Sequence, residues 1–483
     1  MVIDVTHAGP AAVAADVLAV AGRGARLQDL DTLLAGRLAD AAADADPVAV
    51  VHVAGALSAP RVAVVAIDDA DTETLRTAAA RAVRAHRGAR TVAWALDESL
   101  AVGAEDQVAA LVEGAILGGY DAGRWKSGAR ARSVERFVVC GAREELRAAA
   151  TRAEIVARWT NVARELVDAP PNVATPTALA ERAAAIGGLR VEALDPVATG
   201  LPALAAVGGS SSVEPLLIVL RHEPREAPDT RRLALVGKAV TFDAGGYFLK
   251  PQSDIVRQKG DMAGGAAVLA ALGAIAELGV PLPVLGVLPA CENMLGTHAM
   301  RPSDVIATAA GLTVEVTNPD AEGRLILADA LWYARGQGAT HTVDLATLTG
   351  AMRAGMGDLY GGVFANDDAW RAAVVDAGNA AGDLAWPWPL HPRYRRLLES
   401  RVADLRNTSG KPFGYPITAA TFLERFAGTE PWAHVDMLGP ALLDEDRGDA
   451  VGPGATGYGV RMLVELASRL ADDVTAQARA RWP

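Results

Sequence analysis

The first third of the chain alternates short apolar runs with longer runs of helical periodicity. Four apolar runs have the length and composition of buried strands: Pro47–Val53, Arg61–Ile67, Arg90–Leu96 and Glu135–Gly141. Two helices are predicted between them, over Asp71–Gly88 and Glu105–Lys126, with acidic residues at their starts and basic residues near their ends, as the helix dipole favours. The alternation predicts a small N-terminal α/β domain over residues 1–142, in which no catalytic residue types cluster.

A long helical pattern separates this domain from the rest of the chain. It covers Arg143–Asp168 and stops before Pro170 and Pro171, which cannot continue a helix. We expect this helix to link the N-terminal domain to a second, catalytic domain over residues 169–483.

The second part of the chain also alternates strands with helices. Strands are predicted at Pro215–His222, Arg232–Thr241, Leu282–Ala290, Thr313–Asn318 and Thr340–Leu348. Helices are predicted at Met262–Leu278 and Leu325–Gly336. This order predicts an α/β domain with a mixed, mostly parallel central sheet flanked by helices. Because such sheets bind ligands beyond the carboxyl ends of their strands, the residues that follow each strand are the candidates for chemistry.

Composition narrows the class of protein. The 483 residues include 46 basic and 58 acidic side chains, a net charge of −12. This balance argues against nucleic acid or an anionic membrane as the main partner and fits a cytoplasmic enzyme. The two cysteines, Cys140 and Cys291, exclude a disulfide framework and disfavour a cysteine-based metal site. The N-terminus carries acids and no basic start, so we expect no secretory signal.

One apolar run resembles a membrane span in composition. It covers Gly264–Ala290, but Glu277 and three prolines interrupt it. A helix followed by a strand explains this run better than a transmembrane segment does.

Charged side chains follow the predicted strands of the second domain. Five carboxylates, two lysines and one arginine fall near the carboxyl edge of one predicted sheet: Lys238, Asp243, Lys250, Asp261, Asp320, Glu322, Arg324 and Asp344. Taken singly, such residues have ordinary explanations, because Asp261 could cap the following helix and Glu322 with Arg324 could form a surface ion pair. Taken together, the acids would repel each other strongly unless a divalent cation neutralised them.

The stretch NPDAEGRL, residues 318–325, is the most concentrated part of this set. Proline and glycine exclude a helix there, and residues two apart in an extended chain point to the same side, so Asp320 and Glu322 converge. Carboxylates without Cys or His in the same motifs suit Mg, Mn or Zn. A bridging pair suits two ions about 3.5–4 Å apart, and a lysine of lowered pKa could add a nitrogen ligand. Spacing does not tell whether Lys238 or Lys250 would do so.

Longer motifs carry a family resemblance. VGKAVTFDAGGYFLKP, GDMAGGAA, ENMLGTHAMRPSDV, NPDAEGRLILADAL and DLATLTGA occur in this order between residues 236 and 351. Together with ARELVDAPPNVATP, WAHVDMLG and GATGYGVRML, they resemble the leucyl aminopeptidase (cytosol aminopeptidase) family of two-metal exopeptidases. The resemblance covers Arg164–Leu470, whereas the N-terminal domain matches only loosely.

The resemblance implies a metal-ligand set and a catalytic pair. It gives five metal ligands: Lys238, Asp243, Asp261, Asp320 and Glu322. Asp243 and Glu322 would bridge two divalent ions per subunit, Mn or Zn, with Mg and Co as further candidates. Lys238 and Asp261 would complete the tighter site, and Asp320 would serve the more exchangeable one. Lys250 and Arg324 would be catalytic, and the arginine would hold a bicarbonate ion that acts as general base.

The activity implied by the resemblance is that of an aminopeptidase. An ion-activated water would release the N-terminal amino acid from a peptide, and Lys250 with one ion would stabilise the tetrahedral oxyanion. Because the ions would bind the free α-amino group, such an enzyme trims from the N-terminus. The family further implies a homohexamer, which no feature of the sequence itself indicates.

Some positions depart from the family pattern. Pro319 stands where threonine is common, which removes a backbone donor and fixes φ. Gln258 stands where an apolar methionine is common in the pocket for the first side chain, which Thr347 and Gly350 should also border. A polar residue in that pocket weakens the case for strict leucine preference.

Other functions stay open at this point. One is a specialised dipeptidase, for instance for cysteinylglycine, and another is a DNA-binding or scaffolding protein of the same fold, against which the charge of −12 argues. GPGATG at residues 452–457 lacks the preceding strand of a dinucleotide site, and GGSSS at residues 208–212 lacks the closing glycine of a nucleophile elbow. Structural roles are expected for His298, His341 and His434. The sequence does not name the native metals, the preferred N-terminal residue or the physiological peptide.

Overall fold

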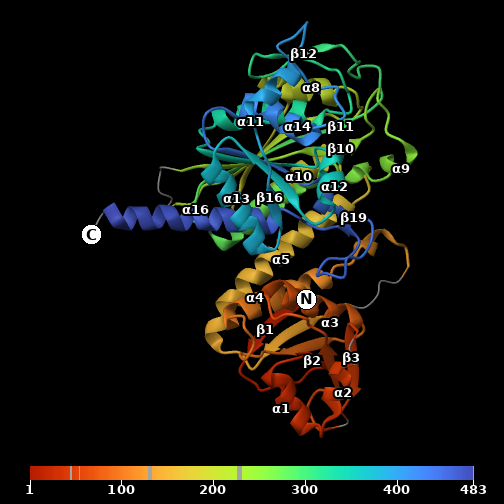
Figure 1. The fold of residues 1–483 in the computed structure, drawn as a ribbon, viewed down its shortest axis with the longest axis vertical. Helices are drawn as coiled ribbons and strands as arrows, with labels where there is room; N and C mark the ends of the chain where they lie inside the picture. Colours follow the sequence, from red (N-terminus) through yellow and green to blue (C-terminus); the bar gives the residue numbers. More distant parts are fainter. Residues whose placement is uncertain (44–45, 54, 129–132, 226–230, 482–483) are drawn as a thin grey trace. The chain divides into compact units, whose positions relative to one another are not determined.

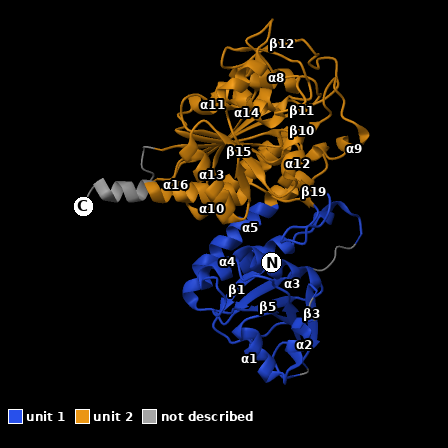
Figure 2. Cartoon of the chain, viewed as in Figure 1, with its two compact units in different colours: residues 1–161, 444–453 blue, residues 162–443, 454–483 orange. Residues whose placement is uncertain are grey.

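The structure is a computed structural model that describes residues 1–43, 46–53, 55–128, 133–225 and 231–481, with side chains up to residue 473 (Figure 1). The chain forms two compact units (Figure 2). Unit 1 comprises Met1–Asn161 and Asp444–Pro453, and unit 2 comprises Val162–Leu443 and Gly454–Pro483. The predicted two-domain α/β class is confirmed, whereas the boundaries at residues 142 and 168 stay a prediction.

Unit 1 is built on a six-stranded sheet of order β1-β6-β5-β2-β4-β3 in its described residues. All neighbouring strands are parallel except β3 and β4. The four predicted strands are present as β3 (Val48–His52), β4 (Arg61–Val65), β5 (Thr91–Ala95) and β6 (Arg136–Cys140). Two further strands were not predicted, β1 (Val2–Thr6) and β2 (Val17–Ala21).

The helices of unit 1 cover this sheet. They are α1 (Ala25–Leu33), α2 (Arg37–Ala43), α3 (Thr72–Ala85) and α4 (Ala104–Gly118). Asp71 caps α3, because its carboxylate accepts a hydrogen bond from Thr74 N at 2.7 Å. The helix predicted to reach Lys126 is shorter, since α4 ends at the glycine pair and a separate 3-10 turn, η1 (Ala122–Trp125), follows.

The predicted linking helix is present as α5 (Arg147–Asp168). A 3-10 turn, η2 (Glu144–Leu146), precedes it, and the helix ends before the two prolines at residues 170 and 171. Its first residues belong to unit 1 and its last residues to unit 2.

Unit 2 is built on a nine-stranded mixed sheet among the residues that the structure describes. Its order is β16-β15-β18-β14-β9-β11-β8-β7, and β10 pairs with β11. The strands are β7 (Arg190–Leu194), β8 (Leu216–His222), β9 (Leu233–Gly237), β10 (Ala239–Asp243), β11 (Val284–Asn293), β14 (His341–Ala346), β15 (Gly361–Ala365), β16 (Ala385–Pro387) and β18 (Trp432–Asp436). The pairs β14–β9, β14–β18, β9–β11, β10–β11 and β15–β16 are parallel, as expected for a mostly parallel sheet.

Helices flank the main sheet of unit 2, as predicted. They are α6 (Pro176–Ala184), α7 (Pro196–Thr199), α8 (Pro202–Gly208), α9 (Gln252–Ile255), α10 (Ala263–Leu278), α11 (Gly323–Gly336), α12 (Gly350–Met356), α13 (Asp368–Ala381), α14 (Tyr415–Ala427), α15 (Leu438–Ala441) and α16 (Val460–Arg481). Two 3-10 turns, η3 (Gln258–Gly260) and η4 (Pro392–Leu398), lie in the connections.

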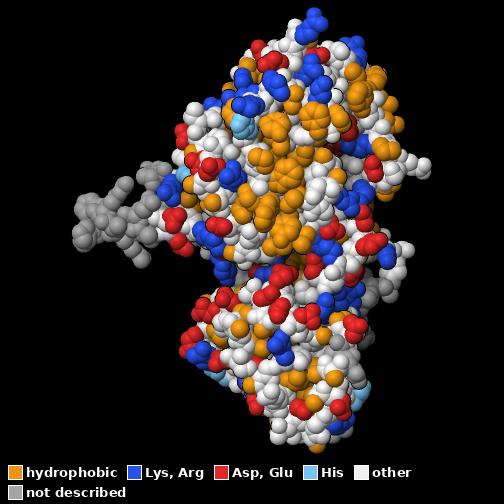
Figure 3. All heavy atoms as spheres, viewed as in Figure 1, with side chains coloured by type: hydrophobic (Ala, Val, Ile, Leu, Met, Phe, Trp, Pro, Cys, Tyr) orange, Lys and Arg blue, Asp and Glu red, His pale blue; other side chains and the backbone are white. Residues whose placement is uncertain are grey.

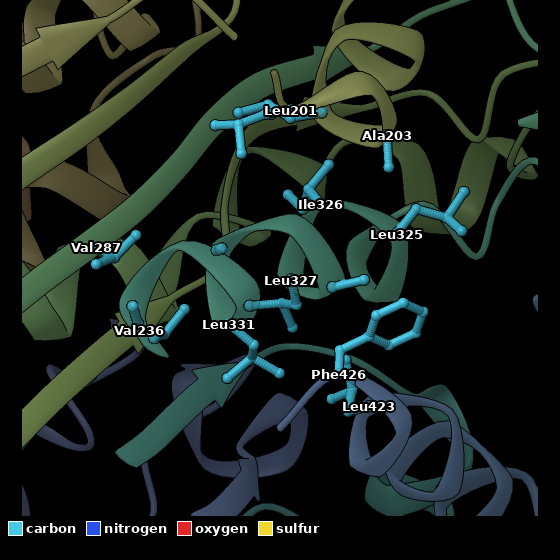
Figure 4. Close-up of a cluster of buried hydrophobic side chains, with 14 of the residues drawn as sticks. Leu201, Ala203, Val236, Val287, Leu325, Ile326, Leu327, Leu331, Leu423 and Phe426 are labelled. Carbon is cyan, nitrogen blue, oxygen red and sulfur yellow. The ribbon is translucent and has the colours of Figure 1, made fainter. Parts of the chain in front are cut away.

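The main core of unit 2 lies between the sheet and the helices α8, α11 and α14. Figure 4 shows Leu325 and Leu327 of α11, Val236 of β9 and Phe426 of α14 within this cluster. All are fully buried. Apolar packing therefore fixes the first turn of α11. Because the charged residues directly precede this turn in the chain, the same packing fixes where they lie.

One predicted strand belongs to a different sheet. The Thr313–Asn318 strand is present only as β13 (Thr313–Glu315), which pairs with β12 (Val305–Ala307) and β17 (Leu405–Arg406) in a separate three-stranded sheet. The expectation that Asp320, Glu322 and Arg324 follow a strand of the main sheet is therefore wrong. The apolar alternation predicted the strand but could not tell which sheet it joins.

The apolar run at residues 264–290 forms α10 followed by β11, as predicted. Residues Gln258–Leu278 are the single stretch within the described residues that is long and apolar enough to cross a bilayer. Within unit 2, 83% of its apolar window is buried. The burial explains its composition, because a helix that is apolar all round is typical of a protein core.

Candidate active site

Lys238 lies where β9 ends and β10 begins. Its backbone N–H donates to the carbonyl of Leu345 at 3.0 Å, and its own carbonyl accepts from Gly265 N at 2.7 Å, so the backbone changes partners here. The start of α10 approaches very closely, since a Cβ on Gly237 would lie 2.5 Å from the carbonyl oxygen of Gly264. The Lys238 side chain is consequently buried, with an exposed fraction of 4%.

Asp243 ends β10 and is held from two sides. Its Oδ1 accepts hydrogen bonds from Gly245 N at 2.9 Å and from Asn293 Nδ2 at 2.8 Å. Its Oδ2 lies 2.7 Å from Lys250 Nζ. Lys250 comes from the next loop, and its backbone N–H donates to the carbonyl of Ala244 at 3.0 Å.

Asp261 lies between η3 and α10. Its Oδ1 accepts from Thr347 Oγ1 at 2.9 Å, and its Oδ2 lies 2.8 Å from Lys238 Nζ. The helix cap of α10 is Met262, and no side chain makes a capping hydrogen bond there. The Asp261 carboxylate therefore faces Lys238 and does not cap the helix.

Asp320 and Glu322 lie in the loop that leads into α11. The backbone N–H of Asp320 donates to Asn318 Oδ1 at 2.9 Å, and its carboxylate Oδ1 lies 2.5 Å from Lys250 Nζ. Glu322 Oε1 lies 2.8 Å from Lys238 Nζ. Glu322 Oε2 is buried and accepts no hydrogen bond within the described part of the chain. An unpartnered buried carboxylate oxygen is costly unless a cation approaches it.

Three of these carboxylates can converge on one ion. Asp243, Asp320 and Glu322 each offer an oxygen, and these oxygens lie within 4.8 Å of one another. Hard oxygen donors at this spacing suit a divalent cation. Together with the unpartnered Oε2 of Glu322, this arrangement fits a metal ion.

The carboxylates of the cluster carry more charge than the lysines can balance. Four carboxylates face two ammonium groups, so the fully ionised cluster would have a charge of −4 + 2 = −2. Burial, and next the charge of Glu322, raise the pKa of Asp243 to about 7. Burial likewise raises the pKa of Asp320, and raises that of Asp261 well above its usual range. A divalent cation would restore the balance of charge.

The two lysines act as the cations of the cluster in this structure. Burial alone would lower the pKa of Lys238, but Asp261 and Glu322 outweigh it, and the pKa is raised. The pKa of Lys250 is raised for the same reason, mainly by Asp243 against the effect of burial. A charged ammonium cannot be a metal ligand, so a lysine ligand must lose its proton when an ion binds.

Arg324 lies in the first turn of α11 and is buried, with 1% exposed. Its Nη1 donates to the carbonyl of Asn407 at 2.7 Å, and its guanidinium carbon lies 5.2 Å from the centre of the Tyr415 ring. Nε has no hydrogen-bond partner in the described residues. A carbonyl and an aromatic face thus fix the guanidinium, and its Nε–H makes no hydrogen bond within the described residues.

A pocket of about 420 Å³ opens beside the acidic cluster. Four members of the cluster, Lys238, Asp243, Asp261 and Asp320, line it together with Lys250. The remaining wall combines apolar and polar side chains, among them Gln258, Thr347, Gly350, Tyr415, Leu438, Ala441 and Leu442. The size suits one amino-acid side chain with part of a peptide.

The structure brings nearly all the predicted site residues together. The five expected ligands and Lys250 form one cluster, Arg324 follows it at the start of α11, and Gln258, Thr347 and Gly350 line the adjoining pocket. Thr347 also contacts Asp261 directly, and Gln258 Nε2 donates to the carbonyl of Asp254 at 3.2 Å.

Asp344 is the exception, and its expected place at the sheet edge is wrong. It lies within β14 and not beyond it, opposite Val236 and His434 on the neighbouring strands. Its carboxylate accepts from Trp432 Nε1 at 2.7 Å and contacts His434 Nδ1 at 2.6 Å. Asp344 and His434 form a fully buried pair that makes no contact with the described metal-ligand candidates.

Sequence reasoning also missed two buried asparagines. Asn293 ends β11, and its place at the carboxyl end of a strand could have indicated it. Asn407 follows the two-residue strand β17, which gives no apolar signal in the sequence. Both hydrogen-bond the loops that carry the carboxylates.

A mixed α/β sheet with a lysine-bearing acidic cluster beside it is an arrangement that suits metal-dependent hydrolysis. Comparison with known proteins gives the family. Residues 161–464 match the catalytic domain of the cytosol aminopeptidase family, and residues 19–129 match its N-terminal domain. The chain belongs to the cytosol aminopeptidase family, as its motifs predicted.

Relatives match over most of their length. A probable cytosol aminopeptidase of Solibacter usitatus is 42% identical over 457 residues, which cover 92% of this chain and 94% of that protein. One of Nitratidesulfovibrio vulgaris is 40% identical over 448 residues, covering 88% of each chain.

Solved structures share the fold. The bottromycin maturation enzyme BotP in complex with Mn has a TM-score of 0.85 and 36% identity, covering 95% of this chain and all of the other. A tomato leucine aminopeptidase mutant has a TM-score of 0.87 and 32% identity, covering 97% and 96%. This protein is therefore a metal-dependent aminopeptidase, a hydrolase that acts on peptides, and neither the dipeptidase nor the scaffold alternative is favoured.

Proposed function

We propose that this aminopeptidase works with two divalent ions held by the acidic cluster. The ligands are Lys238, Asp243, Asp261, Asp320 and Glu322. Asp243 and Glu322 would be shared by the two ions, Lys238 and Asp261 would belong to one site, and Asp320 would belong to the other. The observation that carries this proposal is the convergence of oxygens from three carboxylates within 4.8 Å of one another, beside a Glu322 Oε2 that is buried and has no hydrogen-bond partner among the described residues.

The donor set suits Mn or Zn best, with Mg and Co as further candidates. Oxygen donors accept all four metals, and a lysine nitrogen favours the borderline ions over Mg. The similar BotP structure contains Mn, which supports manganese as the first metal to test. Ions in this place would polarise the first carbonyl of the peptide and lower the pKa of a water molecule.

Lys250 and Arg324 act on the reacting groups. Lys250 Nζ lies between Asp243 and Asp320, so its charge is placed to stabilise the oxyanion that develops on the carbonyl. Arg324 would hold a bicarbonate ion, which would supply a general base. Its buried Nε has no partner in the described residues, so the guanidinium has at least one donor available for an anion.

The adjoining pocket receives the side chain of the first residue of the peptide. Gln258 brings an amide to this pocket, while Leu438 and Ala441 supply apolar surface. We infer a preference that is broader than leucine and includes side chains able to hydrogen-bond Gln258. A panel of aminoacyl-anilides measures this preference, and the account predicts that glutamine or methionine substrates compete well with leucine.

We further propose a cytoplasmic homohexamer. Figure 3 shows apolar side chains gathered on one face of unit 2, and exposed large apolar residues of that unit include Trp386, Phe413 and Leu359. Apolar surface of this kind marks an interaction site. Six chains of 49.9 kDa would give about 300 kDa by light scattering, and a mass near that of one chain would contradict the hexamer.

The direct test of the proposed function is hydrolysis of leucyl-anilide before and after treatment with a chelator. We expect activity to disappear with the metal and to return with Mn or Zn, because the ions supply the activated water. The variant Glu322→Gln should stay inactive after metal is added back, since it removes the bridging charge. Full activity in excess chelator would contradict the proposal.

A further inference from the structure

Asn407 makes hydrogen bonds to several parts of the proposed site. It follows β17 directly and is fully buried. Its backbone N–H donates to the carbonyl of Glu315 at 3.0 Å, which extends the pairing of β13 with β17 by one residue. The small three-stranded sheet therefore fixes where the Asn407 side chain lies.

The side chain of Asn407 hydrogen-bonds the loop that carries Asp320 at several points. Its Oδ1 accepts from the backbone N–H of Thr317 at 2.8 Å and from that of Asn318 at 3.2 Å. Its Nδ2 donates to the carbonyls of Asn318 at 2.7 Å and of Ala321 at 3.4 Å. A carboxamide has two donors and one oxygen acceptor, so these bonds use its whole capacity.

The backbone of Asn407 holds the proposed catalytic arginine. Its carbonyl accepts from Arg324 Nη1 at 2.7 Å, a charge-assisted hydrogen bond between buried groups. One residue thus contacts the segment before Asp320, the residue after it and the guanidinium that follows Glu322 in the chain.

A second amide holds the same loop from the other side. Asn293 Nδ2 donates to Asp243 Oδ1 at 2.8 Å and to the carbonyl of Pro319 at 3.1 Å. Because Pro319 has no N–H and a fixed φ, the loop depends on its carbonyls and on neighbouring N–H groups for anchorage. Asn407 supplies most of these bonds.

We propose that Asn407 is a positioning residue of the aminopeptidase reaction, which sets the place of Asp320 relative to Arg324. This inference rests on the proposed roles of those two residues. A displacement of about 1 Å between reacting groups lowers rates steeply, so a residue that fixes both groups controls the chemical step. Substrate binding through the Gln258 pocket is not expected to depend on it.

The test compares Asn407→Asp and Asn407→Ala with a matched control, Asn366→Asp. The aspartate keeps the shape of the side chain but replaces the NH2 donor with an oxygen, which repels the carbonyls of Asn318 and Ala321. The alanine removes every hydrogen bond of the side chain. Asn366 makes a bridge of the same chemistry at an exposed position of unit 2, since its Nδ2 donates to the carbonyl of Glu430 and its Oδ1 accepts from Trp432 N. It lies beside the first residue of β18, at the end opposite Asp436.

Three quantities are measured on each folded variant: manganese affinity by paramagnetic resonance titration, kcat and KM on leucyl-anilide, and the melting temperature. Losing a group that orients a ligand typically costs about 10–100-fold in affinity or activity. We expect a loss of this size in kcat and in the affinity of the weaker manganese site for both Asn407 variants, with KM little changed. Asn366→Asp should lower only the melting temperature.

Retention of wild-type manganese affinity and kcat in either folded Asn407 variant would overturn the inference, even if its melting temperature falls, because a merely structural role predicts that result. A wild-type protein that binds manganese but cleaves no anilide would overturn the proposed function instead. In that case the manganese affinities of the two variants still decide the role of Asn407.

Discussion

At the scale of single residues, two sets of buried charges differ in their balance. Lys238 and Lys250 stand against four carboxylates in the acidic cluster, and His434 stands against Asp344 inside the sheet. The cluster has more carboxylates than lysines and so keeps a net negative charge, whereas the pair has one carboxylate for one imidazole. Only the cluster therefore calls for a cation.

The His434–Asp344 pair makes a prediction about pH. Burial lowers the pKa of His434, but the charge of Asp344 outweighs it, so the pKa is raised above the usual value of about 6.5. A raised pKa means that the folded state holds the proton more tightly, so the pair stabilises the fold fully below about pH 6.5. This stabilisation is lost as the pH rises through the raised pKa.

The measurement is the free energy of unfolding in chelator at several pH values, for the wild type and for His434→Asn. Asparagine can donate to Asp344 without titrating, so the other titrating groups cancel in the difference. We expect the advantage of the wild type to be largest in acid and to shrink with rising pH. A difference that does not change with pH would show that the pair does not hold a proton.

The candidate ligand residues were predictable as a set and through the family resemblance, whereas the residues that hold them in place were not. Asp261, Asp320 and Glu322 stand in connections and Asp243 ends a strand, and glycine or proline lies within two residues of each, which the sequence displays. Asp344 was grouped with them although the predicted strand Thr340–Leu348 already contained it, and the structure places it inside β14. The contacts of Asn407 depend on strand register between segments about 90 residues apart, which no local pattern encodes.

At the scale of elements, the site depends on how closely α10 packs on the sheet. A Cβ on Gly264 would overlap the carbonyl oxygen of Leu345 in β14, and a Cβ on Gly265 would lie 2.7 Å from the Cβ of Ala239. The helix and the sheet therefore pack with their backbones in direct contact, because the glycines have no side chains. Asp261 precedes this contact by a few residues, so the contact determines where Asp261 lies.

We predict that Gly264→Ala lowers both stability and metal binding. The added methyl group must push the start of α10 away from β14, and overpacking of this kind costs about 1–3 kcal/mol. Asp261 should move with the helix, so manganese affinity should fall as well. The control is Gly336→Ala at the end of α11, where a Cβ meets nothing within 4 Å. Equal melting temperatures and manganese affinities for the two variants would contradict this account of the packing.

The elements themselves were predicted to different extents. Long apolar runs such as the one that became α10 and β11 carried a clear signal. Strands β15 and β18 were missed because glycines or a histidine interrupt their short apolar runs, and β7 because polar residues do. The strand β13 was found, but its membership of a separate sheet follows from its pairing with β12 and β17, which only tertiary structure decides.

At the scale of the whole molecule, ion binding and folding should be linked. The candidate ligands come from three separate segments of the chain: the junction of β9 with β10 and the end of β10, the connection between η3 and α10, and the loop before α11. An unfolded chain cannot present them together, so an ion binds the folded state and stabilises it. At a metal concentration about 100 times the dissociation constant, this linkage adds about 2.7 kcal/mol.

We therefore predict that manganese raises the melting temperature of the metal-free wild type by several degrees. The variant Glu322→Gln should show little or no rise, because it lacks the carboxylate that we propose both ions share. Calorimetry of both proteins with and without manganese measures the effect. An equal rise in the wild type and the variant would place the stabilising ion elsewhere.

The most direct test of the central claim is anomalous diffraction from crystals grown with manganese. The account predicts two peaks per chain among Lys238, Asp243, Asp261, Asp320 and Glu322, with Asp243 and Glu322 touching both. No peak at this cluster, with Lys238 and Lys250 still paired to the carboxylates, would contradict it.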